Sequence, residues 1–286
     1  MKKLLAILLA ATMCVTLLAA CGGQTADTST DGDTADTATT DTGTDTNASD
    51  LVYAVETGSA GEAAAKEQGW EINSVAAQAD ALMEVEAGTS DAAIVDLLMA
   101  TAMTGEGSSY PDLTYNGDEK LTTEEYGIGC RKGSDLAAFI NNVLAETYAD
   151  GSMKQIADTY KLADAMVEQP AADASYTVPT DGDVAYIQDK GTLVVGITEF
   201  EPMDYKDANG NWIGFDADMA KLVAEKLGVD IEFTVINWDN KIMELDAKSI
   251  DVVWNGMTLT DEVKNSMECT NPYFNNAQVV VTKAAE

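Results

Sequence analysis

The strongest constraint on the fold is an alternation of two kinds of segment after residue 50. Short runs rich in β-branched and other apolar residues predict buried strands. They are "LVYAV" (51–55), "AAIV" (92–95), "TLVVGI" (192–197), "IEFTVI" (231–236), "DVVW" (251–254) and "QVVVT" (278–282). Amphipathic segments with helical periodicity lie between them. This alternation predicts an α/β fold with mostly parallel sheets.

Two of the helical segments have recognisable ends. One begins near Asp216 and stops at Gly228, since glycine readily adopts the left-handed conformation that closes a helix. Another follows the N-cap candidate Ser134 and ends at Gly151. Residues 163–186 break the alternation with prolines, small residues and acids, so we interpret them as a linker.

The first fifty residues predict export and anchoring. Two lysines and a long apolar run make residues 1–20 a secretory signal peptide. The tetrapeptide Leu-Ala-Ala-Cys that ends at Cys21 resembles a bacterial lipobox, so we expect a lipid anchor on Cys21. The alternative is an ordinary signal peptide with an incidental cysteine. Residues 21–50 are acidic and rich in threonine, and they lack the apolar surface that would offset the entropy of ordering, which predicts a disordered tether.

Two cysteines remain for the folded part. Cys14 leaves with the signal peptide, and Cys21 is the proposed lipid site, so Cys130 and Cys269 are left. In a secreted protein the two could form a disulfide. The alternative is that both act as small buried hydrophobic residues.

Acidic residues dominate the composition. The chain has 49 Asp and Glu against 16 Lys and Arg, no histidine, and a formal net charge of −33. Proteins that bind nucleic acid or anionic lipid directly need a basic surface, which argues against both partners. The absence of histidine removes the commonest general base and zinc ligand. We therefore expect no metal and no cofactor.

Two stretches carry the motifs of one protein family in swapped order. Residues 191–283 include "GTLVVGI", "PMDYKDANGNWIGFDADMAKLVAEKLGV" and "DVVWNGMTLTDEVKNSMECTNPYF". This stretch resembles the first half of the bacterial extracellular solute-binding proteins that feed polar amino acids to ABC importers. Residues 51–162 include "AVETGSAGEAAAKEQG", "GTSDAAIVD", "YGIGCRKGSDL" and "INNVLAETYADGSMKQIADTYKL", and they resemble the second half. The chain is therefore interpreted as a circular permutant of that family.

The resemblance implies a two-lobed, type II periplasmic-binding-protein-like α/β fold with two mostly parallel sheets and a two-strand hinge. The expected parts are lobe 2 (51–127 with 278–286), the hinge (128–130 and 274–277), lobe 1 (131–162 with 187–273) and a linker (163–186) that joins the family's natural ends. In this family the ligand binds between the lobes and hinge closure buries it.

The resemblance also assigns binding roles. Asp96 ends a predicted strand and matches the acid that meets the ligand's ammonium group; alternatively it is only a helix N-cap. Gly58, Ser59 and Ala60 begin a helix whose free N–H groups would receive a carboxylate. Trp238 matches the aromatic wall over the ligand, where it could stack on a cationic group, although it could equally be a core residue.

Further positions are predicted to line the same cleft: Glu56, Glu199, Phe200, Asn255, Met257 and Thr258. Phe200 would face the ligand from the side opposite Trp238, with Glu199 beside it. Acidic candidates around a tryptophan favour a cationic or amine-bearing ligand, with an ordinary polar amino acid as the alternative.

One position departs from the family pattern. The family has Thr-x-x-Arg, and that arginine holds the ligand's carboxylate through two parallel hydrogen bonds. Here Thr260 is followed by Asp261, Glu262 and Val263, so the arginine is absent. Lys264 is adjacent but should point elsewhere. The carboxylate would then rest on the helix N-terminus and nearby backbone, or the ligand lacks one.

The function implied is a substrate-binding component of an ABC importer. Its partners would be a small-molecule ligand, a transmembrane permease and a cytoplasmic ATPase. The protein would be monomeric and held by Cys21 at the extracellular face of the cytoplasmic membrane. One alternative is a ligand sensor that signals to a membrane receptor. Another is an enzyme on the same fold, for which Glu56 and Glu199 form the acid pair to test.

Overall fold

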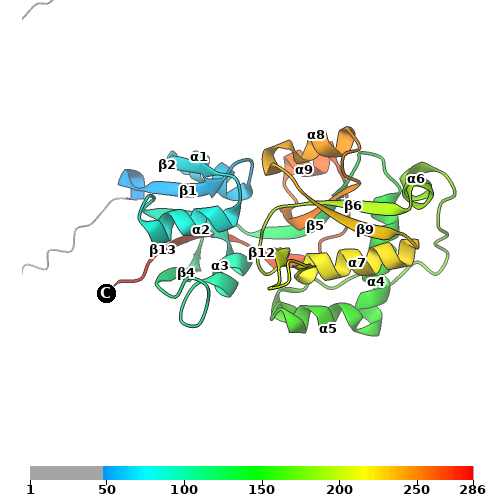
Figure 1. Cartoon of the computed structure of the whole chain (residues 1–286), viewed down its shortest axis with the longest axis horizontal. Helices are drawn as coiled ribbons and strands as arrows, with labels where there is room; N and C mark the ends of the chain where they lie inside the picture. Colours follow the sequence, from blue (N-terminus) through cyan, green and yellow to red (C-terminus); the bar gives the residue numbers. More distant parts are fainter. Residues whose placement is uncertain (1–47, 286) are drawn as a thin grey trace, which may run out of the picture. The chain divides into compact units, whose positions relative to one another are not determined.

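The computed structural model describes residues 48–285. The predicted signal peptide (1–20), Cys21 and the tether up to residue 47 lie outside the described residues. The last three tether residues form a short 3-10 helix, Ala48–Asp50. Two large sheets organise the rest of the chain, and each forms the centre of one lobe (Figure 1).

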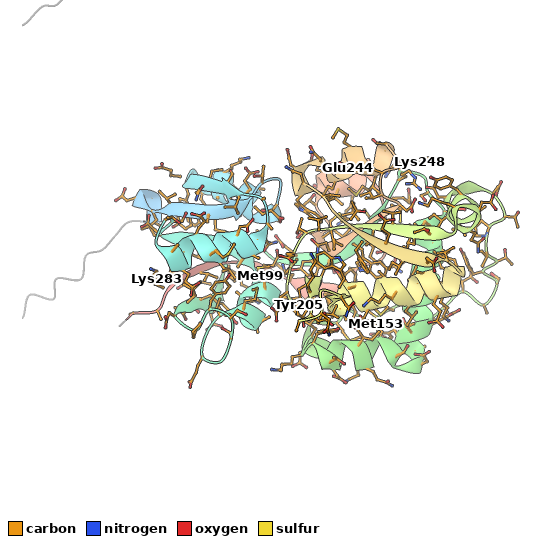
Figure 2. The ribbon with its side chains drawn as sticks, viewed as in Figure 1. Met99, Met153, Tyr205, Glu244, Lys248 and Lys283 are labelled. Atoms are coloured by element: carbon orange, nitrogen blue, oxygen red, sulfur yellow. The ribbon has the colours of Figure 1, made fainter. Side chains whose placement is uncertain are left out.

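Lobe 2 is the part built on the five-stranded sheet. Its strand order is β2-β1-β3-β13-β4, in which β2 and β3 run parallel to β1, whereas β13 is antiparallel to β3 and β4. The elements are β1 (Val52–Glu56), α1 (Ala60–Gln68), β2 (Glu71–Val75), α2 (Gln78–Ala87), β3 (Ala92–Asp96), α3 (Leu97–Met103), β4 (Leu113–Lys120) and β13 (Gln278–Lys283). Lys283, labelled in Figure 2, marks the end of β13.

Lobe 1 is the part built on the six-stranded sheet. Its strands follow the order β11-β5-β10-β6-β9, and β12 also pairs with β5. The strands are β5 (Glu124–Cys130), β6 (Thr192–Ile197), β9 (Asp230–Val235), β10 (Val252–Thr258), β11 (Glu268–Cys269) and β12 (Phe274–Asn276), with a separate pair of β7 (Tyr205–Lys206) and β8 (Trp212–Ile213). The helices are α4 (Leu136–Asp150), α5 (Ser152–Thr159), η2 (Ala163–Ala165), α6 (Gly182–Lys190), α7 (Phe215–Leu227), η3 (Trp238–Asn240), α8 (Lys241–Asp246) and α9 (Asp261–Ser266).

The predicted α/β class with two sheets is confirmed, but the sheets are mixed. In each large sheet, as far as the structure describes it, two pairings are parallel and the remaining ones are antiparallel. All six predicted strands are present. The helix expected near Asp216 is α7, and it ends at Gly228 with φ 76°. Strands joined by a crossover helix run parallel to each other. In contrast, β5 arrives in lobe 1 from lobe 2 and β13 arrives in lobe 2 from lobe 1, and each is antiparallel to its neighbours.

One of the two connections between the lobes lies earlier than the sequence predicts. β4 ends in lobe 2 and β5 begins in lobe 1, so residues 121–123 link the sheets. Residues 128–130 belong to β5 and pair with β10 and β11 deep in lobe 1. On the other connection, Ala277 separates β12 from β13. The two links lie side by side, because Gln278 N donates to Thr122 Oγ1 at 2.9 Å.

The predicted linker, 163–186, is shorter at both ends, because η2 occupies Ala163–Ala165 and α6 begins at Gly182. Residues 182–186 are the first turns of α6, which buries Val184 and Ile187. Asp135 Oδ1 accepts the amide N–H groups of Asp183 and Val184 at 2.9 and 3.0 Å, and so caps α6 from the start of α4. The irregular linker therefore spans about residues 166–181.

The two cysteines are free in the structure. Cys130 pairs with Glu268 across β5 and β11, while Cys269 pairs with Gly129. Since successive side chains of a strand point to opposite faces, Cys130 and Cys269 lie on different faces of the sheet. They pack in two separate hydrophobic clusters. The alternative of two small apolar residues therefore describes them, and a disulfide does not.

The candidate ligand site is an interlobe cleft

A cleft of about 350 Å³ lies between the lobes. Lobe 2 supplies Glu56, Gly58, Ser59, Ala60 and Asp96 from the ends of β1 and β3 and the start of α1. Lobe 1 supplies Phe200, Trp238, Asn255, Met257 and Thr258. A volume of this size suits one small organic molecule. Ten of the eleven residues predicted from the sequence therefore line one cavity; their binding roles remain predictions.

Glu199 is the exception. Its side chain is exposed and does not line the cleft, whereas Phe200 is 2% exposed and does. Neighbouring residues of an extended chain point in opposite directions, so only one of the two can face the cavity. The acid pair Glu56 and Glu199, considered for an enzyme, is therefore not assembled in the cleft.

The start of α1 forms the lobe 2 edge of the cleft. Ser59 is the N-cap, and its Oγ accepts the Glu62 N–H at 3.0 Å. Gly58 has φ 76°, and a Cβ on it would lie 2.7 Å from the Asp239 Cα of lobe 1. Only glycine allows this approach. The Glu62 N–H is thus already bonded, and Glu62 Oε2 accepts the Gly58 N–H at 3.1 Å. The amide N–H groups of Ala60 and Gly61 have no carbonyl to bond within the helix, which leaves them available to an anion.

Asp96 ends β3, and the surrounding side chains nearly saturate its carboxylate. Oδ1 accepts Tyr126 OH at 2.8 Å, Gln278 Nε2 at 3.0 Å and Asn276 Nδ2, while Oδ2 accepts Gln78 Nε2. Asp96 is 2% exposed, and no side-chain cap bond to α3 is formed. Burial and the nearby Glu124 carboxylate raise its pKa to about 7. An ammonium group would therefore reach Asp96 chiefly through Oδ2.

Glu124 joins the same network at the junction of the lobes. Its Oε2 accepts Thr258 Oγ1, Gln278 Nε2 and Asn276 Nδ2 at 3.0–3.1 Å. Asn276 and Gln278 flank one connection between the lobes, Glu124 itself follows the other, and Thr258 belongs to β10, which lines the cleft. The two buried acids thus tie the cleft wall to the connections between the lobes.

Glu56 is the least satisfied acid of the cleft. It is 2% exposed, and its Oε1 has no hydrogen-bond partner in the structure. Burial raises its pKa to about 8, although Thr198 and Lys241 act in the opposite direction. A buried polar atom without a partner costs free energy. A donor supplied by a bound ligand would remove that cost.

Sequence reasoning missed Lys241, the first residue of α8. Its side chain is 9% exposed, and Nζ donates to Trp238 O and to Gly58 O of the other lobe, both at 3.1 Å. Nζ also lies 4.9 Å from the centre of the Trp238 ring. Burial lowers the pKa of Lys241, although Glu56, Glu262 and Asp239 oppose this. Lysine on a short polar helix resembles a solvent-facing residue, so no sequence signal reveals its burial.

Asn255 forms the floor of the cleft, and its side-chain amide is fully hydrogen-bonded within the protein. Asn255 Oδ1 accepts both N–H and O–H of Thr198, while Nδ2 donates to Thr198 O and to Asp204 Oδ2. The next residue, Gly256, donates to Asp216 Oδ2 at 2.6 Å and lets the Phe200 ring pack on its backbone, where a Cβ would lie 2.6 Å away. Asn255 therefore shapes the floor and has no side-chain donor left for a ligand.

Val263 lines the cleft where the resemblance expects an arginine, and it is 4% exposed. Lys264 is exposed and outside the lining, in line with the expectation that it points elsewhere. Among the described lining residues, Lys241 is the one cation beside five acids: Glu56, Asp96, Asp239, Asp261 and Glu262. The cleft is thus strongly acidic with a single buried ammonium group.

Residues 48–285 make up the part of the chain that the structure describes. That part of the chain contains no cluster of three or more His, Cys, Asp or Glu side chains arranged to hold a metal ion. Nor does it contain a helix with the length and hydrophobicity required to cross a membrane.

Part of the chain is similar to known proteins. Residues 193–286 match the bacterial extracellular solute-binding proteins, family 3. This part of the chain is similar in sequence to that family. The L-cystine-binding protein TcyJ of Escherichia coli (strain K12) is 32% identical over 108 residues, which are 37% of the chain and 41% of that protein. The arginine-binding extracellular protein ArtP of Bacillus subtilis (strain 168) is 33% identical over 95 residues, or 33% of the chain and 37% of ArtP.

A solved structure, an ancestral cationic amino acid solute-binding protein, is 42% identical over 29% of the chain and 36% of its own length, with a TM-score of 0.28. The chain spans about two fifths of the length of the two curated relatives that it matches. The sequence matches place the similarity to amino acid solute-binding proteins in this portion of the chain.

Proposed function

We propose that the protein is a solute-binding protein that captures a small cationic amino acid in the interlobe cleft. The observation that carries this proposal is the lining of the cleft. Five acidic side chains and Trp238 line a cavity of about 350 Å³ between the two lobes. One of these acids, Glu56, has a buried oxygen, Oε1, without a hydrogen-bond partner in the structure. Acidic groups and an aromatic face both attract a cation. That a relative is an arginine-binding protein supports the same ligand class.

The proposed cellular role is delivery of this solute to an ABC importer. The partners would be a permease and an ATPase, and the protein would be held at the extracellular face of the membrane by a lipid on Cys21. The family description, which is of extracellular proteins, supports this location. A sensor for a membrane receptor is the alternative role. Mass spectrometry of the membrane fraction tests the anchor, because Cys21→Ser should abolish the acylated species.

Calorimetry tests the ligand class. The titrants are arginine, lysine, putrescine, glutamine and glutamate, each added to the purified folded protein. Binding of arginine or lysine at micromolar or lower Kd, with no response to glutamate, is the expected result. Tight glutamate binding without any response to the cations contradicts the proposal.

We also propose that the chain is a circular permutant. Both sheets have the same arrangement, in which the first strand has two parallel neighbours and an antiparallel strand arrives from the other lobe. In lobe 1 that arriving strand, β5, continues through α4, α5 and α6 to the first strand, β6. In lobe 2 the arriving strand β13 and the first strand β1 are not consecutive. The swapped order of the family-like segments, with a linker in lobe 1, supports this proposal.

A further inference from the structure

We propose that Lys241 is the receptor for the carboxylate of the ligand, so that the protein selects an amino acid over its decarboxylated amine. This inference rests on the proposed function, because it concerns the same cleft. Lys241 is the one cation among the cleft-lining residues of the described chain. A carboxylate in this cleft would lie among five acidic side chains, and it needs at least one close cation to bind.

The position of Lys241 brings two anion-attracting groups together. Its Nζ lies 3.1 Å from Gly58 O, the residue that precedes the N-cap of α1. The ammonium group of lobe 1 therefore meets the N-terminus of a nine-residue helix of lobe 2. The N–H groups of Ala60 and Gly61 and the positive end of the helix dipole act at this place. The Glu62 carboxylate also lies there and accepts the Gly58 N–H at 3.1 Å. A carboxylate between them would contact both lobes.

Lys241 keeps bonding capacity for such a ligand. An ammonium group has three donors, and two are used by Gly58 O and Trp238 O. The third is available. Because the side chain is 9% exposed, a bond from it to a carboxylate forms largely out of water, where it is stronger.

The other end of the ligand has a separate acceptor. Glu56 Oε1 has no partner in the structure and Glu56 is 2% exposed, and the Glu56 carboxylate acts to raise the pKa of Lys241 against the effect of burial. The cleft thus offers an acceptor for a cationic group near a donor for a carboxylate. This pairing fits a molecule that carries both charges, and a diamine would leave Lys241 without its anion.

Three pairs of compounds test the inference by calorimetry: arginine with agmatine, lysine with cadaverine, and ornithine with putrescine. We expect the amino acid of the best pair to bind about 50-fold more tightly than its amine, the range of one charge-assisted hydrogen bond and its partner charge. Lys241→Met should lower this preference to about threefold or less. Amine affinity should change little.

Two matched variants complete the test. Lys241→Arg keeps the charge and should retain most of the preference. Lys264→Met removes a neighbouring lysine that is exposed and outside the lining, and it should leave both affinities unchanged. Thermal unfolding of each variant establishes that it is folded.

The outcomes are distinguishable. If wild type binds amino acid and amine equally, or if Lys241→Met weakens both by the same factor, Lys241 acts only as a structural contact between the lobes and the inference is overturned. If wild type binds none of the six compounds, the proposed function fails and the inference fails with it.

Discussion

The two lobes have the same strand arrangement but contribute different chemistry to the cleft. Lobe 2 contributes two buried acids at strand ends, Glu56 and Asp96, and the N-terminus of α1. Lobe 1 contributes apolar and aromatic walls, the floor at Asn255, and the ammonium group of Lys241. One topology thus provides strand ends at a common edge, and the residues placed there decide what each lobe can bind.

The lobes also differ in how their sheets are completed. In lobe 1 the chain runs from β5 to β6 through the α-helices α4, α5 and α6. Asp251 binds the C-terminal end of α6. The Asp251 carboxylate accepts Lys190 Nζ at 2.5 Å, Arg131 Nη2 at 3.5 Å and Val194 N–H at 2.8 Å. In lobe 2 no segment of the described chain directly joins β13 to β1. Lobe 1 should therefore depend on a buried ionic junction that lobe 2 does not need.

Asp251→Ala should have the largest effect on stability. Asp251 is 1% exposed. Its removal takes away a negative charge that balances the positive charge of Arg131, which is 8% exposed. Breaking a buried ion pair from one side typically costs about 3–5 kcal/mol, so we expect a loss of about 3 kcal/mol in the free energy of unfolding. Urea denaturation measures it. Asp158→Ala, which breaks the exposed pair with Lys154, is the control and should cost less than about 0.5 kcal/mol.

A loss below 1 kcal/mol for Asp251→Ala would show that the buried ionic junction contributes little to the stability of lobe 1.

The acids of lobe 2 should make stability fall as pH rises. The pKa of Glu56 is 4.5 when unfolded and about 8 when buried. Between those values the folded state holds a proton that the unfolded state has lost, so the free energy of unfolding decreases with increasing pH. Below 4.5 and above 8 this contribution is constant. Asp96, raised to about 7, acts with the same sign.

Glu56→Gln isolates the effect, because glutamine cannot titrate. Relative to wild type, this variant should become more stable by about 4 kcal/mol between pH 5 and pH 9. Urea denaturation at each pH, compared between the two proteins, removes the contributions of all other groups. The groups that face Glu56 are Thr198, Asp96, Lys241 and Asp80. Parallel pH curves for the two proteins would contradict the prediction.

Several of these features could be read from the sequence, and the errors have physical causes. The strands were predictable because β-branched runs report burial directly. Glu199 was wrongly predicted to line the cleft. Adjacent side chains of an extended segment point to opposite sides, and the sequence does not show which of the two sides faces the cleft. Helix α6 was missed because only Val184 and Ile187 are buried along it, which leaves almost no periodicity. Lys241 was missed because its burial depends on Gly58, 183 residues away along the chain.

Gly58→Ala should weaken ligand binding by about 30-fold or more. A Cβ at this position would lie 2.7 Å from the Asp239 Cα of the other lobe, and a backbone atom cannot move aside as a side-chain tip can. The two lobes would then be held apart at the cleft. Gly69→Ala is a matched control, because Gly69 also has a left-handed φ, 71°, but has open space around it.

Calorimetry and thermal unfolding separate the two effects. Both variants should lose similar stability from the left-handed backbone, about 1 kcal/mol. Only Gly58→Ala should lose affinity. Equal affinity in the two variants would mean that the close approach of the lobes at Gly58 has no role in binding.

The smallest effect is expected from a second circular permutation, which opens the chain in the linker of lobe 1 and joins β13 to β1 in lobe 2. The new chain begins at Asp181, runs to Lys283, continues through a four-residue loop to Val52, and ends at Val167. The loop is long enough, because Thr282 pairs with Ala92 and Ala92 with Tyr53. The ends to be joined are thus two strands apart, roughly 10 Å, and four residues span up to about 13 Å. Since every strand keeps its neighbours, ligand affinity should stay within about threefold of wild type. Failure of the rewired chain to fold, or loss of the ligand by a folded one, would contradict the proposed permutation and with it the equivalence of the two lobes.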